Sequence, residues 1–411
     1  MLTHSLFKVS SSFWEKLGQF SAVALAFVIP ISTSMTSVFA WIILLSFLFG
    51  ENKTLKKEIF FHHPLVKWIY PLIILMGIGI TYSIANMDEV RDRMMDALRL
   101  AWIPLLIYFY QTKKIAKWAL WAFVAAMLLT LVLAFLKIYA DVPVGLKFPG
   151  GAIFKSHIKT SFFMAMAAFF LAQQIKETAR RYAAGYIILI CLMIYYLLFM
   201  STGRVGYLSL IVCLVLFAWQ NFRLKGIMAA SVVGMSLIVG AYFTSDVFSA
   251  RVNVLSRDWD FYQKGRLMES SLGSRISFAE SSAHLFVKHP WFGWGTGSYG
   301  KAYEKHHEGE KIIFTDNPHN EYLRTAVELG MLGLGLLFMF FYHQWRLSKQ
   351  LPLETRRFYQ GVLLTFMMGC FINSWLTDFT EGYFYCVITA ICFASLPPKE
   401  NTNQLRQSVL H

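Results

Sequence analysis

The hydropathy pattern of the chain is a succession of long apolar stretches, separated by short breaks that carry charged residues, glycine or proline. A helix needs about 20 mostly apolar residues to cross the hydrocarbon of a bilayer, so each such stretch predicts a membrane span. Glycine and proline within a span are tolerated, because neighbouring helices satisfy the freed backbone groups. The pattern predicts about twelve spans, at 17–34, 35–49, 65–83, 94–110, 118–138, 156–175, 182–200, 205–219, 226–243, 322–344, 358–376 and 382–396.

One long polar segment, 244–321, interrupts this pattern. It holds nine Lys and Arg, ten Asp and Glu, and many aromatic residues, and loops of this length that are not disordered usually carry function. Residues 274–288 space their apolar positions as an amphipathic helix does and end before Pro290. The predicted organisation is therefore spans over 1–243, a folded and mostly helical loop over 244–321, further spans over 322–396, and a tail over 397–411.

Lysine and arginine in the short loops predict the orientation, because cytoplasmic loops carry the excess of these residues. The loops and ends on one side hold nineteen of them, whereas the short loops opposite hold five. Both termini are therefore expected in the cytoplasm, with 244–321 outside. A cleaved signal peptide ending near Ala40 is an alternative for the first span, although that apolar stretch is longer than an ordinary signal-peptide core.

Composition agrees with an all-α polytopic membrane protein. Of the 411 residues, 56% are hydrophobic and 15% charged, whereas soluble domains carry about 25% charged residues. The net charge is +14, but its Lys and Arg are dispersed, so no nucleic-acid partner is expected. All five cysteines lie in apolar segments, so neither a disulfide framework nor a thiolate metal site is predicted.

Three segments on the outer side carry candidate chemistry. The first is the turn S-T-G-R-V-G, in which Arg204 would sit at the N-terminus of the following span. Unpaired backbone N–H groups together with a guanidinium make a good phosphate site. The alternative is an arginine that extends to lipid head groups.

The second segment comprises Gly273-Ser274-Arg275 and the later stretch H-P-W-F-G-W-G-T-G-S-Y. Its glycines permit tight turns and a close approach of the backbone to a ligand. The G-x-G pattern is not a dinucleotide fingerprint, because no strand precedes it. The alternative is a structural turn with aromatic anchors at the membrane interface.

The third segment, D-N-P-H-N-E-Y-L, opens the tenth predicted span. Asn317 is a suitable N-cap and Pro318 a suitable first helical residue. His319 would then lie in the first helical turn, where the helix dipole opposes protonation and keeps the imidazole able to accept a proton. Asp316 or Glu321 would orient its ring. The alternative is a capping or interfacial histidine.

Further polar residues are expected at the same membrane face. Arg99 has Asp96 three residues earlier, which predicts a local ion pair. The remaining candidates for additional substrate contacts are Arg91, Arg93, Lys155, Lys159 and Asn320.

Two patterns suggest a metal instead. Asp258-Trp259-Asp260 is similar to the D-x-D that holds a metal and a sugar phosphate in many glycosyltransferases, and five of the eleven histidines lie between 284 and 319. Three letters are weak evidence, however, and no H-x-x-x-H with a nearby glutamate occurs at helical spacing. No metal site is therefore predicted.

The ordered set of these motifs resembles the O-antigen ligase family of bacterial envelope glycosyltransferases, over nearly the whole chain. The resemblance implies a GT-C-like fold and transfer of a glycan from undecaprenyl diphosphate to the lipid A–core oligosaccharide, on the periplasmic face of a Gram-negative inner membrane. It implies that Arg204 and Arg275 hold the donor diphosphate and that His319 is the general base. It also implies that neither a metal nor any other cofactor takes part, and that the active site lies in the 244–321 loop.

The motifs do not separate the branches of this family. O-antigen polymerases and protein O-oligosaccharyltransferases share them, although the latter usually continue further after the last span, whereas this chain ends about fifteen residues past it. A third alternative, from another class, is a transporter of lipid-linked glycans, which would bind the same diphosphate but need no base beside an acceptor.

Overall fold

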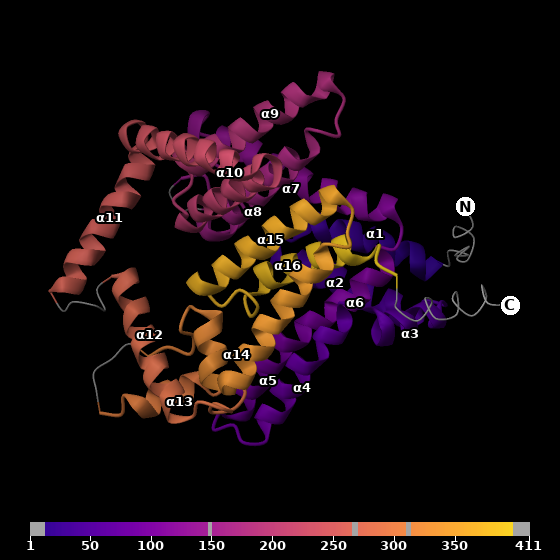
Figure 1. The fold of residues 1–411 in the computed structure, drawn as a ribbon, viewed down its shortest axis with the longest axis vertical. Helices are drawn as coiled ribbons and strands as arrows, with labels where there is room; N and C mark the ends of the chain where they lie inside the picture. The colour runs from indigo at the N-terminus through magenta and orange to yellow at the C-terminus, as the bar shows by residue number, and fades with distance from the viewer. Residues whose placement is uncertain (1–12, 147–149, 265–269, 310–313, 398–411) are drawn as a thin grey trace.

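The computed structural model describes residues 13–146, 150–264, 270–309 and 314–397, and within these ranges it contains helices and no strands (Figure 1). Short 3₁₀ or π turns, η1–η3, continue some of the helices. The predicted tail lies, apart from residue 397, outside the described residues. The helices are α1 (Phe13–Val28), α2 (Thr33–Phe49), α3 (Lys53–His62), α4 (Tyr70–Ile80), α5 (Met87–Leu98), α6 (Trp102–Phe109), α7 (Lys113–Tyr139), α8 (His157–Gln174), α9 (Arg180–Tyr195), α10 (Arg204–Thr244), α11 (Asp246–Gln263), α12 (Ser271–Lys288), α13 (Tyr299–His306), α14 (Glu321–Ser348), α15 (Leu353–Ile372) and α16 (Phe379–Phe393).

Several of these helices have the length and composition of membrane spans. Four qualify among the described residues, namely α7, α9 with its π turn, α10 and α14, and the bent pair α2–α3 would add a fifth. The polytopic membrane class is therefore supported, but the predicted number of twelve spans is not confirmed. One reason is that predicted spans are divided by bends, as where 94–110 falls across α5, η2 and α6.

The helix α10 contains two of the predicted spans. Its backbone leaves the helical region at Arg223, with φ 57° and ψ −142°. Gly234 in the second half lies opposite Leu214 in the first, since a Cβ at Gly234 would be 3.5 Å from the Leu214 side chain. The chain therefore reverses at Arg223, and α10 is a pair of antiparallel helices.

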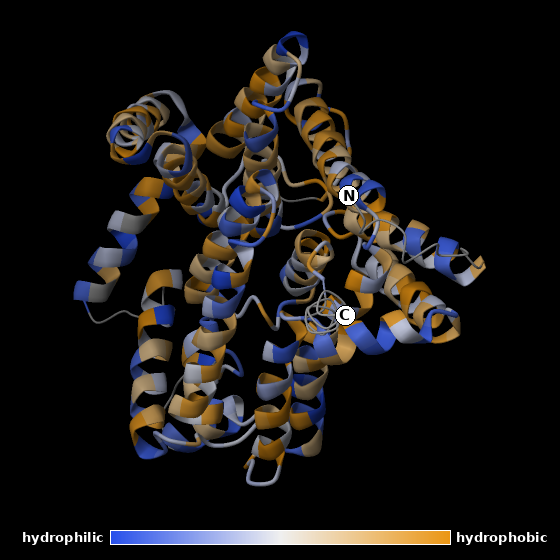
Figure 2. Ribbon diagram, turned by 45° about the vertical axis from the view of Figure 1, so that its right-hand side comes forward, coloured by the Kyte–Doolittle hydropathy of each residue, from blue (hydrophilic) through white to orange (hydrophobic). Residues whose placement is uncertain are grey.

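Two helices at the centre of the molecule are buried on all sides. Residues 160–171 of α8 and 380–393 of α16 are all buried, and the rings of Phe163 and Phe384 pack against each other with centroids 4.9 Å apart. A helix that is apolar around its whole circumference belongs in a core or a membrane. Figure 2 shows hydrophobic residues along most of the helices and more hydrophilic ones on α11, which leaves the end of α10.

The 244–321 segment forms the helices α11, α12 and α13. The predicted helix 274–288 is confirmed as part of α12, whose N-cap Ser270 accepts a hydrogen bond from the Gly273 N–H at 2.9 Å. A small apolar cluster, including Phe278, Tyr303 and Val327, joins α12 and α13 to α14. Figure 1 shows α12 alongside α14, so this segment brings its side chains to the start of α14.

The glycine-rich stretch after α12 fills a break in α14. Gly330 has φ 63° and interrupts the helical backbone, and a Cβ there would lie 2.4 Å from the Trp291 carbonyl. The groups freed by the break are satisfied across it, because the Gly295 N–H donates to the Glu328 carbonyl at 2.9 Å and the Met331 N–H to the Pro290 carbonyl at 2.8 Å. The stretch therefore has a structural role in α14, and its predicted contact with a ligand stays a prediction.

Candidate functional site

Arg204 begins α10 directly after the short turn, as predicted. The turn lies against the first turn of α8, where a Cβ at Gly203 would be 2.5 Å from the His157 carbonyl oxygen, and one at Gly206 would be 2.4 Å from the Ser161 Cβ. Only glycine permits this contact. The glycines of the motif thus place Arg204 beside the start of α8.

Arg204 and Arg275 come together from different helices. Arg275 lies on α12, and burial together with the charge of Arg204 lowers the pKa of its guanidinium. Arg204 has one acidic partner, Asp258 on α11, at 3.5 Å. Arg275 has no carboxylate partner among the residues that the structure describes. The pair of guanidinium groups therefore has one carboxylate partner, bound to Arg204, which leaves surplus positive charge for an anion.

An apolar groove leads away from Arg204. It has a volume of 310 Å³ and lies between α9 with its π turn, both halves of α10, and α11. Apart from Arg204, Arg251 and Tyr207, its lining residues are apolar or glycine, with Leu208, Leu214 and Ile238 among them. Since Arg204 is the first residue of α10, the groove is charged beside the start of that helix and apolar along it.

His319 precedes α14 instead of lying in its first turn. The helix begins at Glu321, and Asn320 is the N-cap, accepting hydrogen bonds from the N–H groups of residues 322 and 323. The prediction of Asn317 as the N-cap is therefore wrong. Asn317 accepts instead from the His319 N–H at 2.9 Å, and His319 takes the left-handed backbone conformation, with φ 52°.

The ring of His319 lies between a loop and α12. Its Nδ1 is 2.9 Å from Oδ1 of Asn373, and Nδ2 of Asn373 donates to the Asp378 carboxylate at 2.6 Å. The other side of the ring is near Phe278, with centroids 6.3 Å apart. Because Arg275 lies three residues before Phe278, one turn of α12 brings the arginine pair and the histidine to the same region.

The groups expected to orient the ring are replaced by others. Neither Asp316 nor Glu321 contacts the imidazole. Glu321 is buried and accepts a hydrogen bond from the Leu376 N–H at 3.1 Å. The loop 373–378, between α15 and α16, supplies the ring's partner instead.

Two lysines of the α8 N-terminus extend this basic region. Lys159 pairs with Glu381 at 3.2 Å, and its charge also acts on the Asp378 carboxyl. Lys155 is 8% exposed. Burial, with the charge of Lys159 beside it, lowers its pKa to about 8. Within the described part of the chain, the Lys155 ammonium has no hydrogen-bond or ion-pair partner.

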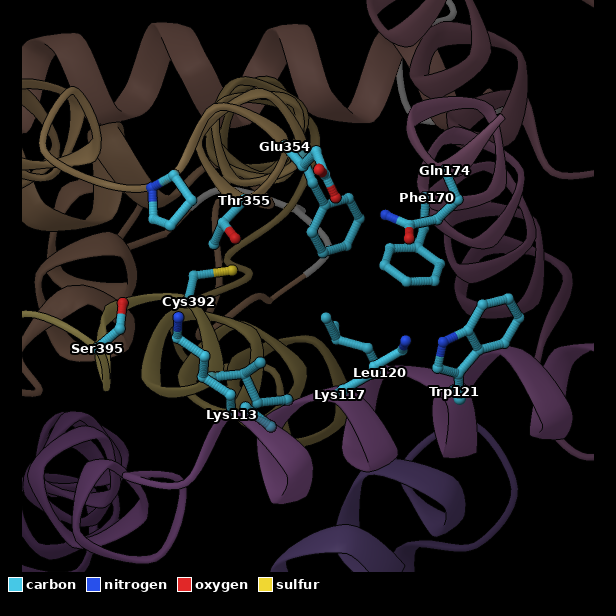
Figure 3. A pocket seen from close by; sticks show the side chains of 14 residues that line it. Lys113, Lys117, Leu120, Trp121, Phe170, Gln174, Glu354, Thr355, Cys392 and Ser395 are labelled. Carbon is cyan, nitrogen blue, oxygen red and sulfur yellow. The ribbon is translucent and has the colours of Figure 1, made fainter. Parts of the chain in front are cut away.

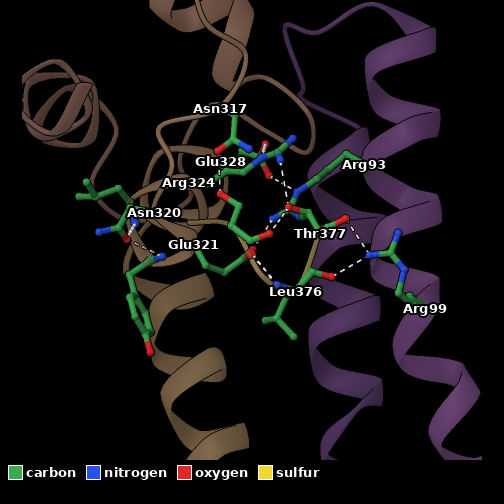
Figure 4. Close-up of polar contacts among 12 residues, drawn as sticks. Arg93, Arg99, Asn317, Asn320, Glu321, Arg324, Glu328, Leu376 and Thr377 are labelled. Atoms are coloured by element: carbon green, nitrogen blue, oxygen red, sulfur yellow. Dashed lines mark hydrogen bonds and ion pairs between the residues drawn. The ribbon is translucent and has the colours of Figure 1, made fainter. Parts of the chain in front are cut away.

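A buried ionic network supports the loop and the start of α14 (Figure 4). Nε of Arg93 is 2.6 Å from Glu328, whose other oxygen is 3.2 Å from Arg324, and Arg93 also reaches Glu321 at 3.4 Å. Arg93 and both glutamates are almost fully buried. The guanidinium of Arg93 is therefore engaged inside the protein, which argues against the predicted contact with substrate.

The predicted ion pair of Arg99 is confirmed and has a further role. Arg99 is 2.7 Å from Asp96, as expected from their spacing. Its guanidinium also donates to the carbonyls of Leu376 and Thr377, at 3.0 and 2.7 Å (Figure 4). Arg99, which directly follows α5, thus holds the loop 373–378 through its backbone carbonyls.

Two other predicted substrate ligands have local partners. Arg91 is exposed on α5 and pairs with Asp88 and Asp92. The side chain of Asn320 caps α14 through its oxygen, and its nitrogen donates to the Phe371 carbonyl. Neither arrangement directs the side chain to the arginine pair or to His319.

The two aspartates of the D-x-D pattern serve separate cations. Asp258 pairs with Arg204, and Asp260 with Lys264 at 2.7 Å. In the described ranges no group of three or more His, Cys, Asp or Glu side chains is arranged to hold a metal ion. The geometry gives the metal alternative no support.

Part of the chain is similar to a known family. Residues 187–338 match a family model described as O-Antigen ligase. The predicted family resemblance is confirmed. The stretch that matches the O-antigen ligase family includes Arg204, Arg275 and His319, but not the loop 373–378. A protein of Haemophilus influenzae described as uncharacterized is 25% identical over 296 residues, which cover 69% of this chain and 73% of the relative.

A second cavity, of 340 Å³, lies at the other ends of the same helices (Figure 3). Its lining includes Gln174 at the end of α8 and Ser395 after α16, whereas Lys159 and Glu381 of the candidate site lie at the starts of those helices. Lys113 and Lys117 face Glu354 there, and burial with the neighbouring Glu177 raises the pKa of the Glu354 carboxyl. No histidine lines this cavity among the described residues, and its two lysines face a glutamate, so it is not the candidate site.

Sequence reasoning missed Asn373, Asp378 and Glu381. Asn373 lies near the end of the predicted span 358–376, and Asp378 and Glu381 lie in the short break before the span 382–396, which is typical of an ordinary loop. The one available signal was polar and acidic residues, N-S-W-L-T-D-F-T-E, beside two apolar stretches. Ionisable groups at such a position are costly and therefore functional candidates.

Proposed function

We propose that this protein is an O-antigen ligase that transfers a glycan from undecaprenyl diphosphate to the lipid A–core oligosaccharide, on the periplasmic face of the Gram-negative inner membrane. The observation that carries the proposal is the meeting of an arginine pair, an apolar groove and a histidine with an oriented ring. The family match supports the general class of reaction. The substrates and the roles of the residues are our inference.

The arginine pair suits the diphosphate of the donor. Guanidinium groups bind phosphate oxygens through two parallel hydrogen bonds. The surplus positive charge at Arg204 and Arg275 would be neutralised by an anion. Lys155 and Lys159, at the start of α8, add positive charge nearby. The groove beyond Arg204 offers an apolar surface to the polyprenyl chain.

The proposed chemistry needs one base and one stabilised leaving group. The acceptor hydroxyl attacks the anomeric carbon of the donor glycan, and the bond from that carbon to the diphosphate oxygen breaks. The hydroxyl proton passes to Nε2 of His319, because a sugar hydroxyl is a poor nucleophile without a general base. Undecaprenyl diphosphate leaves with its charge held by the fixed guanidinium groups.

Three alternatives remain for the test to separate. An O-antigen polymerase would use the same donor site but would extend a second lipid-linked glycan. A protein O-oligosaccharyltransferase would use a serine or threonine of a protein. A transporter of lipid-linked glycans would bind the donor and form no new glycosidic bond. The groove and the arginine pair suit all of these, whereas the oriented histidine favours a transferase.

The deciding experiment is transfer by the purified protein in lipid nanodiscs. Defined undecaprenyl-diphosphate-linked glycan is offered alone, with lipid A–core, and with an unfolded acceptor protein. We expect glycan on lipid A–core, with unchanged yield in EDTA because cationic side chains take the place of a metal. Products only from the donor alone would indicate a polymerase, and glycosylated protein would indicate the oligosaccharyltransferase. The absence of any product with donor bound would contradict a transferase.

A further inference from the structure

We propose that Asn373 and Asp378 are positioning residues that fix the tautomer and the orientation of His319, so that Nε2 faces the acceptor hydroxyl. This inference rests on the proposed general-base role of His319. It concerns the loop between α15 and α16, which lies beyond the part of the chain that matches the family model.

The hydrogen bonds define a direction along the chain of three side chains. An asparagine side chain donates only through its nitrogen, and a carboxylate only accepts. Since Nδ2 of Asn373 donates to Asp378 at 2.6 Å, its Oδ1 must be the atom that faces His319, 2.9 Å from Nδ1. The imidazole must therefore donate from Nδ1. The proton of a neutral ring then sits on Nδ1, and Nε2 keeps the lone pair that a base needs.

The hydrogen-bonded series His319–Asn373–Asp378 is called the relay. The loop that carries Asn373 and Asp378 is held from two sides. Arg99 donates to the carbonyls of residues 376 and 377 and reaches that of Asp378 at 3.3 Å. Glu321 accepts from the Leu376 N–H at 3.1 Å. The loop is therefore fixed to α5 and to the start of α14, the same helix that follows His319. A positioning group has an effect only when its own position is fixed. Here both the loop with Asn373 and Asp378 and the segment with His319 are attached to the start of α14.

The relay also affects the proton that the base acquires. When His319 takes a proton at Nε2, the new positive charge is separated from the Asp378 carboxylate only by the amide of Asn373. Burial raises the pKa of the Asp378 carboxyl, although Lys159, His319 and Arg99 act in the opposite direction. The charged groups around the relay are Lys159 from α8, Asp96 and Arg99 from α5 and η2, Arg324 from α14, and Glu381 from α16.

Two substitutions at Asn373 test the inference through different readouts. Asn373→Leu removes the acceptor for Nδ1, so both tautomers and other ring orientations become accessible. We expect kcat to fall about 10- to 100-fold, the usual cost of losing a group that orients a functional histidine, with the KM for the donor nearly unchanged. Asn373→Asp keeps an acceptor for Nδ1 but replaces the donor to Asp378 with a second carboxyl, which adds a charge that favours the imidazolium where both carboxyls are ionised. We expect transfer to persist, with its acid limb displaced to higher pH by at least about 1 unit.

The controls separate failure of the relay from failure of the proposed function. Asn221→Leu and Asn221→Asp make the same changes on α10, far from His319 along the chain, and are expected to leave both rate and pH profile unchanged. If His319→Ala is inactive while Asn373→Leu transfers normally, or while the acid limb of Asn373→Asp does not move, the positioning role is wrong and the base stands. If His319→Ala transfers normally, the proposed base and this inference are both wrong. Should Asn373→Leu fail to fold, the pH profile of the isosteric Asn373→Asp decides alone.

Discussion

At the scale of single residues, the arginine pair carries more positive than negative charge. The guanidinium groups of Arg204 and Arg275 are close enough to influence each other. One carboxylate, that of Asp258, pairs with Arg204 and offsets one of the two positive charges. Like charges held together cost free energy unless an opposite charge joins them. A diphosphate would supply that charge, so the proposed donor would relieve the repulsion between the two guanidinium groups.

The first prediction concerns the shape of these two cations. Lysine keeps the charge but loses the planar fork that binds a phosphate through two hydrogen bonds. We expect Arg204→Lys and Arg275→Lys each to weaken donor binding about tenfold, measured with lipid-linked donor in nanodiscs. Arg91→Lys is the matched control, since Arg91 is exposed and has its own acidic partners. Donor affinity equal to wild type in both site variants would contradict bidentate binding.

The second prediction concerns Lys155, whose pKa is lowered to about 8 by burial and by Lys159. The ammonium is present below this pH and lost above it, and only the ammonium attracts the diphosphate. Donor affinity should therefore fall as pH rises through about 8. In Lys155→Arg the cation persists, because the guanidinium titrates far above this range. The same decline in that variant would show that Lys155 does not contact the donor.

At the scale of elements, the break in α14 joins the glycine-rich loop to the site. Gly330 lets the helix open, and the loop 290–295 fills the opening with backbone hydrogen bonds. The buried pairs of Glu328 with Arg93 and Arg324 lie in the turn just before the break. Removing one partner of such a buried pair leaves an uncompensated charge, so this region is sensitive to substitution.

The third prediction tests that break. Gly330→Ala puts a methyl group 2.4 Å from the Trp291 carbonyl and forces a left-handed backbone on alanine. We expect a loss of about 1–3 kcal/mol in the free energy of unfolding, or a lower thermal midpoint in detergent. Gly335→Ala is the control in the same helix, because a Cβ there meets nothing within 4 Å. Equal midpoints for both variants would mean that the break is not under constraint.

Local sequence signals placed some of these elements correctly and misplaced others. The spacing of apolar residues correctly predicts a helix at α12. The S-T-G-R-V-G turn correctly predicts that Arg204 begins α10. The predicted helix start near His319 is wrong, because both Asn317 and Asn320 are good N-caps and the sequence alone does not choose between them. The choice is made by tertiary contacts, since Ser374 also bonds Asn317 and draws it away from the helix.

At the scale of the whole molecule, the site combines the starts of α8, α10 and α14, the side of α12 and the loop before α16. The sequence reveals those parts of the site whose residues follow one another along the chain, such as the turn before Arg204. Asn373 lies 54 residues after His319, and nothing local pairs the two. Only the packing of α15 and α16 against α8 and α14 brings that loop to the imidazole.

The fourth prediction concerns the orientation of the molecule in its membrane. The surplus of Lys and Arg on one set of short loops predicts cytoplasmic termini with the 244–321 segment in the periplasm. Reporter fusions after Thr244 and after Arg346 should therefore report opposite sides. A cytoplasmic signal from both would contradict a site that faces the periplasm.

The fifth prediction, on His319→Ala, tests the central claim most directly, because it separates binding of the donor from transfer. Donor binding and glycan transfer are measured on the same nanodisc sample, between about pH 6 and 8. We predict donor affinity near wild type and a transfer rate lower by about 10²–10⁴-fold. The wild-type rate should fall at acid pH as the imidazole is protonated, and this inflection should be absent from the residual rate of the variant. His306→Ala, on α13, should transfer normally. Near wild-type transfer by His319→Ala across this range would contradict the account.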